Sequence, residues 1–182
     1  GWMLYLKRRK QKRLTLAARQ NQTQLKIDPN AEHWLIVYAS QTGTAEQLAW
    51  RTATSLQEAH QPVRVKAIQE LQITDLKNHT QILFVASTYG TGDAPDLSSN
   101  FVKKIMSQSL DLSHLRYAVL ALGSKEYPDS YCDFGHRLAA WLQRNQAHAL
   151  FDTIEVDNAN PADVQRWNQA LAQVTQLELQ SM

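Results

Sequence analysis

The chain has 182 residues, of which 43% are apolar, and this is enough to bury a substantial core in one domain with an appendage. Its net charge of +2 conceals an uneven distribution, because six of the 19 basic residues lie between Lys7 and Arg13 and no acidic residue precedes Asp28. From residue 14 onward 13 basic residues remain against 17 acidic ones, and an acidic domain with scattered Lys and Arg argues against nucleic acid as a partner.

The N-terminal segment resembles the cytoplasmic end of a membrane-spanning helix in the order of its residues. Residues 1–6 are apolar with two aromatic side chains, and the basic run over residues 7–13 follows directly. Because the chain begins with Gly1 rather than Met, we expect it to continue a longer protein. An amphipathic tail or an expression remnant would have the same composition. We therefore predict residues 1–13 as a membrane-proximal segment that tethers a cytoplasmic domain to the inner (cell) membrane.

Residues 14–32 are predicted as a linker, because they are rich in Gln, Asn and Thr and end in the turn signal Asp28-Pro29-Asn30. The pattern then changes to that of a domain over residues 33–182. Short, continuous apolar runs predict five strands buried on both faces, at residues 34–38, 63–67, 82–86, 117–122 and 151–156. Intervening residues predict helices over 45–59, 101–107, 132–144 and 161–177, the last with Asn160 as its cap and Pro161 in first position.

Strands that alternate with helices predict right-handed crossovers and a doubly wound α/β sandwich. In such a fold, ligands bind outside the carboxyl ends of the strands, at the point where the strand order reverses. The residues directly after each strand are therefore the candidates for a functional site.

The first candidate loop leads from the first strand straight into a helix and contains Ser40, Gln41, Thr42, Gly43, Thr44 and Ala45. Backbone N–H groups of the first helical turn, helped by the helix dipole and the hydroxyls, can hold a phosphate dianion. The loop lacks the Lys of a nucleotide-hydrolysing loop, and the G-x-G-x-x-G dinucleotide pattern is also absent. Taken alone, the loop could equally be a hydroxyl-rich helix cap.

The second and third loops contribute glycines and aromatic rings. The second runs through Tyr89, Gly90, Thr91 and Gly92, where the glycines let the backbone approach a flat ligand and the tyrosine can stack on it. On its own it is also compatible with an ordinary surface loop. The third loop begins at Gly123, and its Tyr127 could face Tyr89 across a planar ring. A phosphate site and a slot for a flat heterocycle at one switch point are what FMN requires.

With these three loops in order, residues 33 to about 175 resemble the FMN-binding, flavodoxin-like domain of the diflavin reductase family, which includes the sulfite reductase flavoprotein. The resemblance implies a five-stranded parallel sheet of order 2-1-3-4-5 in a three-layer sandwich. It also implies that the first loop wraps the FMN phosphate, that Tyr89 and Tyr127 flank the isoalloxazine, and that Gly90 lies near the flavin N5 atom. Similar members often carry an acidic residue where this chain has Thr91.

The resemblance further implies that Tyr131 and Cys132 complete the third loop, and it adds Asp157, after the last strand, as a candidate for contacts near the flavin. The predicted FMN-binding residues are Ser40, Gln41, Thr42, Gly43, Thr44, Ala45, Ser87, Thr88, Tyr89, Gly90, Thr91, Gly92, Leu122, Gly123, Ser124, Tyr127, Tyr131, Cys132 and Asp157.

By resemblance, a separate domain would reduce FAD with NADPH and pass electrons to this FMN. The FMN would deliver them singly to a haem, an iron chelate or a metalloprotein. The flavin does the chemistry in such a domain, so no catalytic acid, base or nucleophile is predicted. A free-standing flavodoxin-type carrier is the alternative. A receiver-like regulatory module would need a phosphoacceptor Asp after a central strand, where this chain has Ser40, Ser87 and Gly123.

The remaining chemistry-bearing residues have structural interpretations. Cys132 is the only cysteine, which favours a reducing compartment, and it is expected to pack rather than to act as a nucleophile. Trp50, Trp141 and Trp167 lie in predicted helices and are expected to pack in the core. The six histidines show no ligand spacing, so no metal site is predicted.

Overall fold

The computed structural model describes residues 33–40, 42–88 and 98–180, with side chains as far as residue 176. The predicted membrane-proximal segment, the linker, Gln41 and the loop from Tyr89 to Gly92 lie outside these residues. Within the described ranges, no helix has both the length and the apolar character that crossing a bilayer requires.

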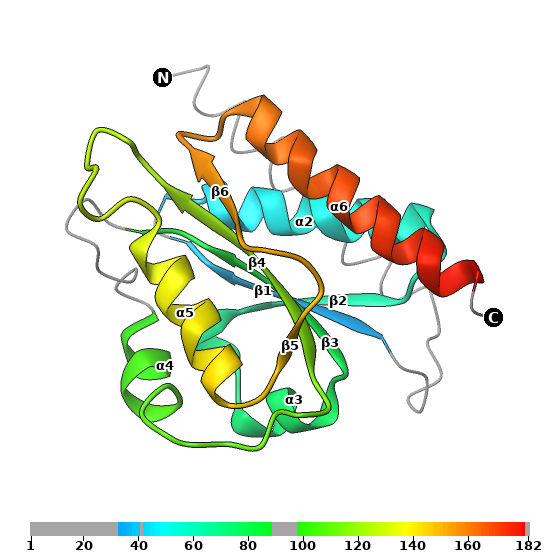
Figure 1. The fold of residues 1–182 in the computed structure, drawn as a ribbon, viewed down its shortest axis with the longest axis horizontal. Coiled ribbons are helices and arrows are strands. Elements are labelled where there is room, and N and C mark those ends of the chain that lie inside the picture. The colour runs from blue at the N-terminus through cyan, green and yellow to red at the C-terminus, as the bar shows by residue number, and fades with distance from the viewer. Residues whose placement is uncertain (1–32, 41, 89–97, 181–182) are drawn as a thin grey trace, which may run out of the picture.

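A parallel sheet forms the centre of the domain (Figure 1). Its strands β2, β1, β3 and β4 lie side by side in that order, and the short strands β5 and β6 both pair with β4. The predicted order 2-1-3-4-5 is therefore confirmed, with one extra strand. The strands are β1 (Trp34–Ala39), β2 (Val63–Ala67), β3 (Gln81–Ala86), β4 (Arg116–Gly123), β5 (His148–Ala149) and β6 (Ile154–Asp157).

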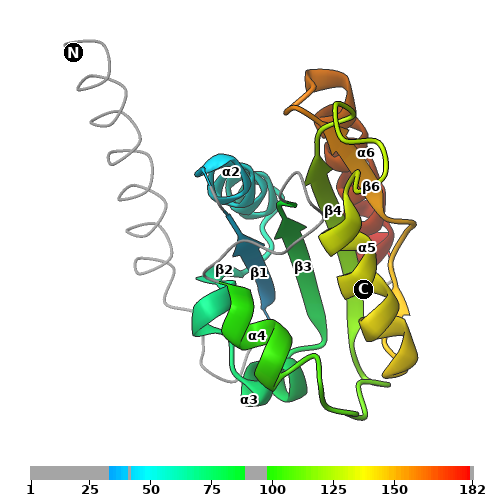
Figure 2. The same cartoon turned by 90° about the vertical axis from the view of Figure 1, so that its left-hand side faces the viewer.

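Helices cover both faces of the sheet, which gives the three predicted layers (Figure 2). Alternate β1 residues explain this arrangement: Leu35 and Val37 belong to the core on one face, and Trp34 and Ile36 to the core on the other. One face is covered by η1 (Ile68–Glu70), α3 (Ile73–Asn78), α4 (Ser99–Lys104) and α5 (Asp133–Arg144). The opposite face is covered by α2 (Thr44–Glu58) and α6 (Pro161–Gln180).

The prediction of a strand at residues 151–156 is wrong for the first half of that range. The chain forms β5 at His148–Ala149, leaves the sheet, and returns as β6 at Ile154–Asp157. Between them the Phe151 ring packs edge-on against Trp167 of α6, with 5.5 Å between the ring centroids. Burial of this ring against the helix therefore outweighs continued pairing with β4.

Helix boundaries differ from the predictions where backbone geometry decides them. Cys132 has φ 57°, a left-handed conformation, so α5 begins at Asp133 and not at Cys132. The short helix α3 was not predicted, because six residues are too few to show a helical period. The predicted start of α6 is confirmed: Pro161 is its first residue, and the Ala162 N–H donates to Asn160 Oδ1 at 2.9 Å.

The three helical tryptophans lie in the core, as predicted. Trp167 is almost completely buried, and its indole N–H donates to the hydroxyl of Thr52 at 3.0 Å. This bond joins α6 to α2, two helices that cover the same face of the sheet (Figure 1). The bond therefore helps to position α2, whose N-terminus faces the candidate site.

We expect Thr52→Val to lower the free energy of unfolding by about 1–3 kcal/mol, because the buried Trp167 N–H loses its acceptor. Thr54→Val is the matched control on the same helix, since Thr54 is exposed and, like Thr52, donates to the carbonyl four residues earlier. It should change the free energy by no more than about 0.5 kcal/mol. Urea unfolding measures both, and equal losses in the two variants would contradict the prediction.

Candidate functional site

The carboxyl ends of β1, β3, β4 and β6 lie at one edge of the sheet (Figure 2). Residues that follow these four strands line an open cavity of about 460 Å³. The predicted loops therefore converge, as far as they are described. The lining contains several hydroxyl side chains, one aromatic ring and one leucine. It comprises Thr42, Thr44, Ser87, Thr88, Leu122, Gly123, Ser124, Tyr127, Ser130, Asn158 and Ala159.

The first loop presents the N-terminus of α2 without a side-chain cap. Gly43, the N-cap residue, has φ 94° and ψ −10°, a conformation that favours glycine, and its N–H donates to Ser40 Oγ at 2.9 Å. The first hydrogen bond within the helix runs from the Gln47 N–H to the Gly43 carbonyl at 3.0 Å. The first-turn N–H groups thus lack the capping oxygen that Ser, Thr or Asp would provide. They are the donors that an anion at this position would use.

Side chains of the first loop divide between the cavity and the interior. Thr42 and Thr44 line the cavity. Ala45 is completely buried in the core beneath α2, so only its backbone can face a ligand. Ser40 acts through its hydroxyl on the Gly43 N–H and does not line the cavity.

The described part of the second loop is held to its neighbours by two hydrogen bonds. The Ser87 N–H donates to the Ala39 carbonyl at 2.9 Å, and the Phe134 N–H donates to Thr88 Oγ1 at 3.2 Å. Ser87 and Thr88 both line the cavity. The Thr88 hydroxyl therefore joins the end of β3 to the start of α5.

The third loop carries the cavity's aromatic side chain. Tyr127 is 52% exposed, and its N–H donates to the Ser124 carbonyl at 3.0 Å in a turn. Gly123 is required by close packing, because a Cβ atom there would stand 2.6 Å from the Cys132 N atom. Ser130 also lines the cavity and was missed by the sequence analysis.

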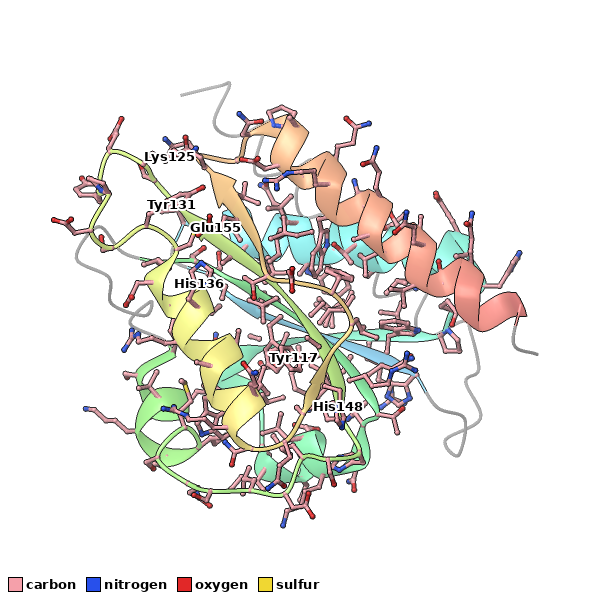
Figure 3. The ribbon with its side chains drawn as sticks, viewed as in Figure 1. Tyr117, Lys125, Tyr131, His136, His148 and Glu155 are labelled. Carbon is pink, nitrogen blue, oxygen red and sulfur yellow. The ribbon has the colours of Figure 1, made fainter. Side chains whose placement is uncertain are left out.

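Tyr131 and Cys132 lie behind this wall and not among the lining residues. The Cys132 thiol is fully buried and donates to the Ala121 carbonyl, with 3.1 Å from Sγ to O. Burial is the main cause that raises its pKa to about 11. Burial also raises the pKa of Tyr131, whose ring centroid is 5.8 Å from Lys125 Nζ. Figure 3 shows Lys125 and Tyr131 at one end of the sheet and His148 at the other.

The turn after β6 forms a further wall that the sequence analysis reached only at Asp157. Asp157 itself is not a lining residue, but its Oδ1 accepts from the Lys125 N–H at 2.9 Å. The next two residues, Asn158 and Ala159, line the cavity. The rule that found the other loops, inspection of the residues directly after each strand, would have found them as well.

Other titratable side chains are engaged away from the cavity. His136 Nε2 lies 2.7 Å from Glu155 Oε2, and His79 Nε2 lies 3.0 Å from His33 Nε2. In the part of the chain that the structure describes, no three His, Cys, Asp or Glu side chains gather in a way that could hold a metal ion.

A family model described as flavodoxin matches residues 36–167. Among curated proteins, the chain is 40% identical over 100 residues to NADPH-dependent diflavin oxidoreductase 1 of Xenopus laevis, covering 53% of this chain and 17% of that protein. It is 33% identical over 141 residues to the sulfite reductase (NADPH) flavoprotein alpha-component of Shewanella sp. (strain ANA-3), and the match covers 77% of this chain and 23% of that protein. It is 34% identical over 129 residues to methionine synthase reductase of Mus musculus, and the match covers 69% of this chain and 18% of that protein. The matched segment is thus less than a quarter of each relative.

Solved flavodoxin structures share the fold. The flavodoxin of Streptococcus pneumoniae TIGR4 superposes with a TM-score of 0.67 at 25% identity, covering 75% of this chain and 93% of that one. Oxidised flavodoxin 1 of Bacillus cereus gives 0.66 at 24% identity, covering 76% and 93%. These matches confirm the predicted flavodoxin-like FMN domain, because flavodoxin domains bind FMN, and they confirm the resemblance to diflavin reductases.

We expect the buried thiol to make stability depend on pH in the alkaline range. The folded-state pKa of Cys132 is about 11, above the ordinary value of 9.0, so the neutral thiol stabilises the fold fully below pH 9. This contribution is lost as the pH rises from about 9 to about 11. Urea unfolding should show a steeper fall in unfolding free energy over this range for the parent chain than for Cys132→Ser, which cannot titrate there. Parallel curves would contradict the assignment.

Proposed function

The chain belongs to the flavodoxin family, and we propose that it is the FMN-binding, electron-transfer domain of an NADPH-dependent diflavin reductase. In this role it receives electrons from an FAD domain and passes them singly to a haem, iron or metalloprotein acceptor. Relatives named as oxidoreductases support a role in an oxidoreductase, and in each of them the matched segment is only a part. The observation that carries the proposal is that one cavity contains both the uncapped N-terminus of α2 and the Tyr127 ring.

The cavity fits FMN at both ends of that molecule. Its volume of about 460 Å³ lies within the usual range for small-molecule sites, about 300–1,000 Å³. For the phosphate, the uncapped first turn of α2 offers N–H donors, and Thr42 and Thr44 offer hydroxyls. For the isoalloxazine, Leu122 and Tyr127 offer apolar surface.

We assign roles to the predicted residues accordingly. The loop from Ser40 to Ala45 holds the phosphate, and Tyr127 with Tyr89 covers the ring. Bound FMN supplies the one-electron and two-electron chemistry. The residues of this chain bind and orient it and exclude water from it, and none acts as an acid, base or nucleophile. Further contacts to the flavin are assigned to Ser87, Thr88, Gly90, Thr91, Gly92, Leu122, Gly123 and Ser124, whereas Tyr131, Cys132 and Asp157 lie outside the cavity lining and are assigned to support of its walls.

Charge near the third loop favours a low reduction potential. Glu126 and Asp129 are exposed beside Tyr127 and outnumber Lys125 in the same loop, whereas Asp133, which opens the next helix, is paired with Arg137 at 3.1 Å. Carboxylates near a flavin disfavour the added negative charge of its reduced form. The same carboxylates would attract a partner of opposite charge to the flavin edge.

Residues 1–13 support a tether as part of this proposal. Their apolar stub followed by six basic residues matches the cytoplasmic flank of a membrane helix. We infer that the domain works on the cytoplasmic side of the cell membrane, and the acceptor would then be reached at or near that surface.

A free-standing flavodoxin-type carrier is the second candidate, because the chain covers 93% of the Streptococcus pneumoniae flavodoxin. The two functions differ in whether an FAD and nicotinamide domain is part of the same protein. A continuous reading frame that encodes an FAD and nicotinamide domain would exclude the free-standing carrier.

We predict that the purified chain takes up about one equivalent of FMN and becomes yellow. Tyr127→Ala should lower the affinity about tenfold, because an aromatic ring at the cavity mouth is lost. Quenching of flavin fluorescence measures the affinity. Gln143→Ala, an exposed residue of α5 outside the lining, is the control and should stay within about twofold. Colourless protein that does not take up added FMN would overturn the proposal.

We predict that Gly43→Ala weakens binding of FMN but not of riboflavin, which lacks the phosphate. A non-glycine residue at φ 94° is strained, and relief of this strain would turn the first-turn N–H groups away from the phosphate. The expected loss for FMN is about tenfold, and riboflavin serves as the internal control. An equal loss for both flavins would place the phosphate elsewhere.

A further inference from the structure

The turn between β6 and α6 lines the cavity with a backbone conformation that requires support. Asn158 has φ 49° and Ala159 has φ 58°, so two consecutive residues other than glycine are left-handed. Both line the cavity. Such conformations persist only where the surrounding contacts determine them. The contacts that hold this turn therefore also shape the cavity wall.

The turn is closed by its own hydrogen bond, from the Asn160 N–H to the Asp157 carbonyl at 3.0 Å, and Asp163, in the first turn of α6, supports it from outside the cavity. Its Oδ2 accepts from the Asp157 N–H at 3.1 Å, and its Oδ1 accepts from Arg166 Nη2 at 2.7 Å. Arg166 Nη2 also donates to the Glu155 carbonyl at 3.3 Å. The Asp157 N–H and then Arg166 hold the pKa of Asp163 below its ordinary value, so it is a carboxylate at neutral pH.

These contacts fall on the outer side of β6. The Asn158 N–H donates to the Gly123 carbonyl of β4 at 3.0 Å, and successive backbone groups of a strand point to opposite sides. The Asp157 N–H therefore points away from β4, where Asp163 receives it. Asp163 and Arg166 take the place that a neighbouring strand would have.

Asp157 transmits this support to the third loop. Its Oδ1 accepts from the Lys125 N–H at 2.9 Å, while the next residue donates to the Gly123 carbonyl. Asp157 thus connects two walls of the cavity, the third loop and the turn after β6. Its own backbone N–H donates to Asp163.

We propose that Asp163 is a positioning residue for the flavin site, an inference that rests on the proposed function. Without touching the ligand, it holds Asp157 so that the third loop and the Asn158–Ala159 turn stand at the spacing that the ring requires. Protein that lacks this carboxylate keeps its fold but presents a wider, less ordered slot.

The position of β6 in the sheet indicates which part of the flavin Asp163 should affect. The phosphate loop follows β1, and β6 lies three strand positions away, across β3 and β4. At about 4.8 Å per strand the two sites are about 14 Å apart. Loss of Asp163 should therefore weaken ring binding and leave the contribution of the phosphate unchanged.

The test measures FMN and riboflavin affinities of the full chain by fluorescence quenching, together with urea unfolding. Asp163→Ala should lower both affinities by the same factor, about tenfold, because a charged hydrogen-bond acceptor is lost. Asp163→Asn keeps an oxygen that can accept from the Asp157 N–H and should recover part of the loss. Asp111→Ala is the matched control: this carboxylate also accepts two hydrogen bonds, from the Ser113 N–H and hydroxyl, but lies outside the cavity lining. It should leave both affinities within about twofold.

A purely structural role for Asp163 would lower the unfolding free energy and leave both affinities of the folded protein unchanged, and this result would overturn the inference. A loss confined to FMN would overturn it as well, since the phosphate would then be the part affected. If Asp163→Ala does not fold, unchanged affinities of Asp163→Asn and of Arg166→Ala overturn it. Parent chain that binds neither flavin refutes the proposed function itself, whereas a bound flavin insensitive to Asp163 refutes only this inference.

Discussion

The site depends on the close approach of the start of α5 to the end of β4. A Cβ atom on Gly135 would collide with the Cβ of Ala121, and the Cys132 thiol donates to the carbonyl of that same alanine at 3.1 Å. The Phe134 N–H reaches Thr88 Oγ1 at 3.2 Å. One contact region therefore fixes the end of β3, the end of β4 and the first turn of α5. The turn after β6 takes its position from the same region, because β6 pairs with β4 and the Asn158 N–H donates to the Gly123 carbonyl.

The central strands β1, β3 and β4 could be predicted because they are buried on both faces and form nearly continuous apolar runs. In contrast, β2 carries the partly or fully exposed Arg64 and Lys66 and is not buried on both faces, so that part of the prediction was wrong. The order of the sheet came from the resemblance, since pairing order leaves no trace in periodicity. The failures have local causes. The final strand splits because Phe151 packs on Trp167, a contact between residues that no short pattern links. Helix α3 is too short to display a period.

Within the site, the residue types that follow each strand can be taken from the sequence, whereas most of the backbone conformations that shape the cavity cannot. The positive φ of Gly43 is one that glycine readily adopts. Cys132, Asn158 and Ala159 are also left-handed, but their side chains give no sign of it. That is why the β6 turn was recognised only at Asp157, and why the helix predicted to begin at Cys132 begins at Asp133. The expected packing of Cys132 is confirmed, because its side chain is fully buried.

The exposed ring of Tyr127 explains how a cavity made mostly of small hydroxyl side chains can retain a flat ligand. Among the described residues it is the one large apolar side chain left exposed, at 52%. Its backbone is already fixed, because its N–H donates to the Ser124 carbonyl and its carbonyl accepts from the Ser130 N–H at 3.2 Å. A ligand ring that covers Tyr127 removes apolar surface from water, worth about 25 cal/mol per Å². Because the turn that carries Tyr127 is formed before the ligand binds, little binding free energy is spent on ordering it. One aromatic side chain can therefore contribute substantially to the affinity for a flat ligand.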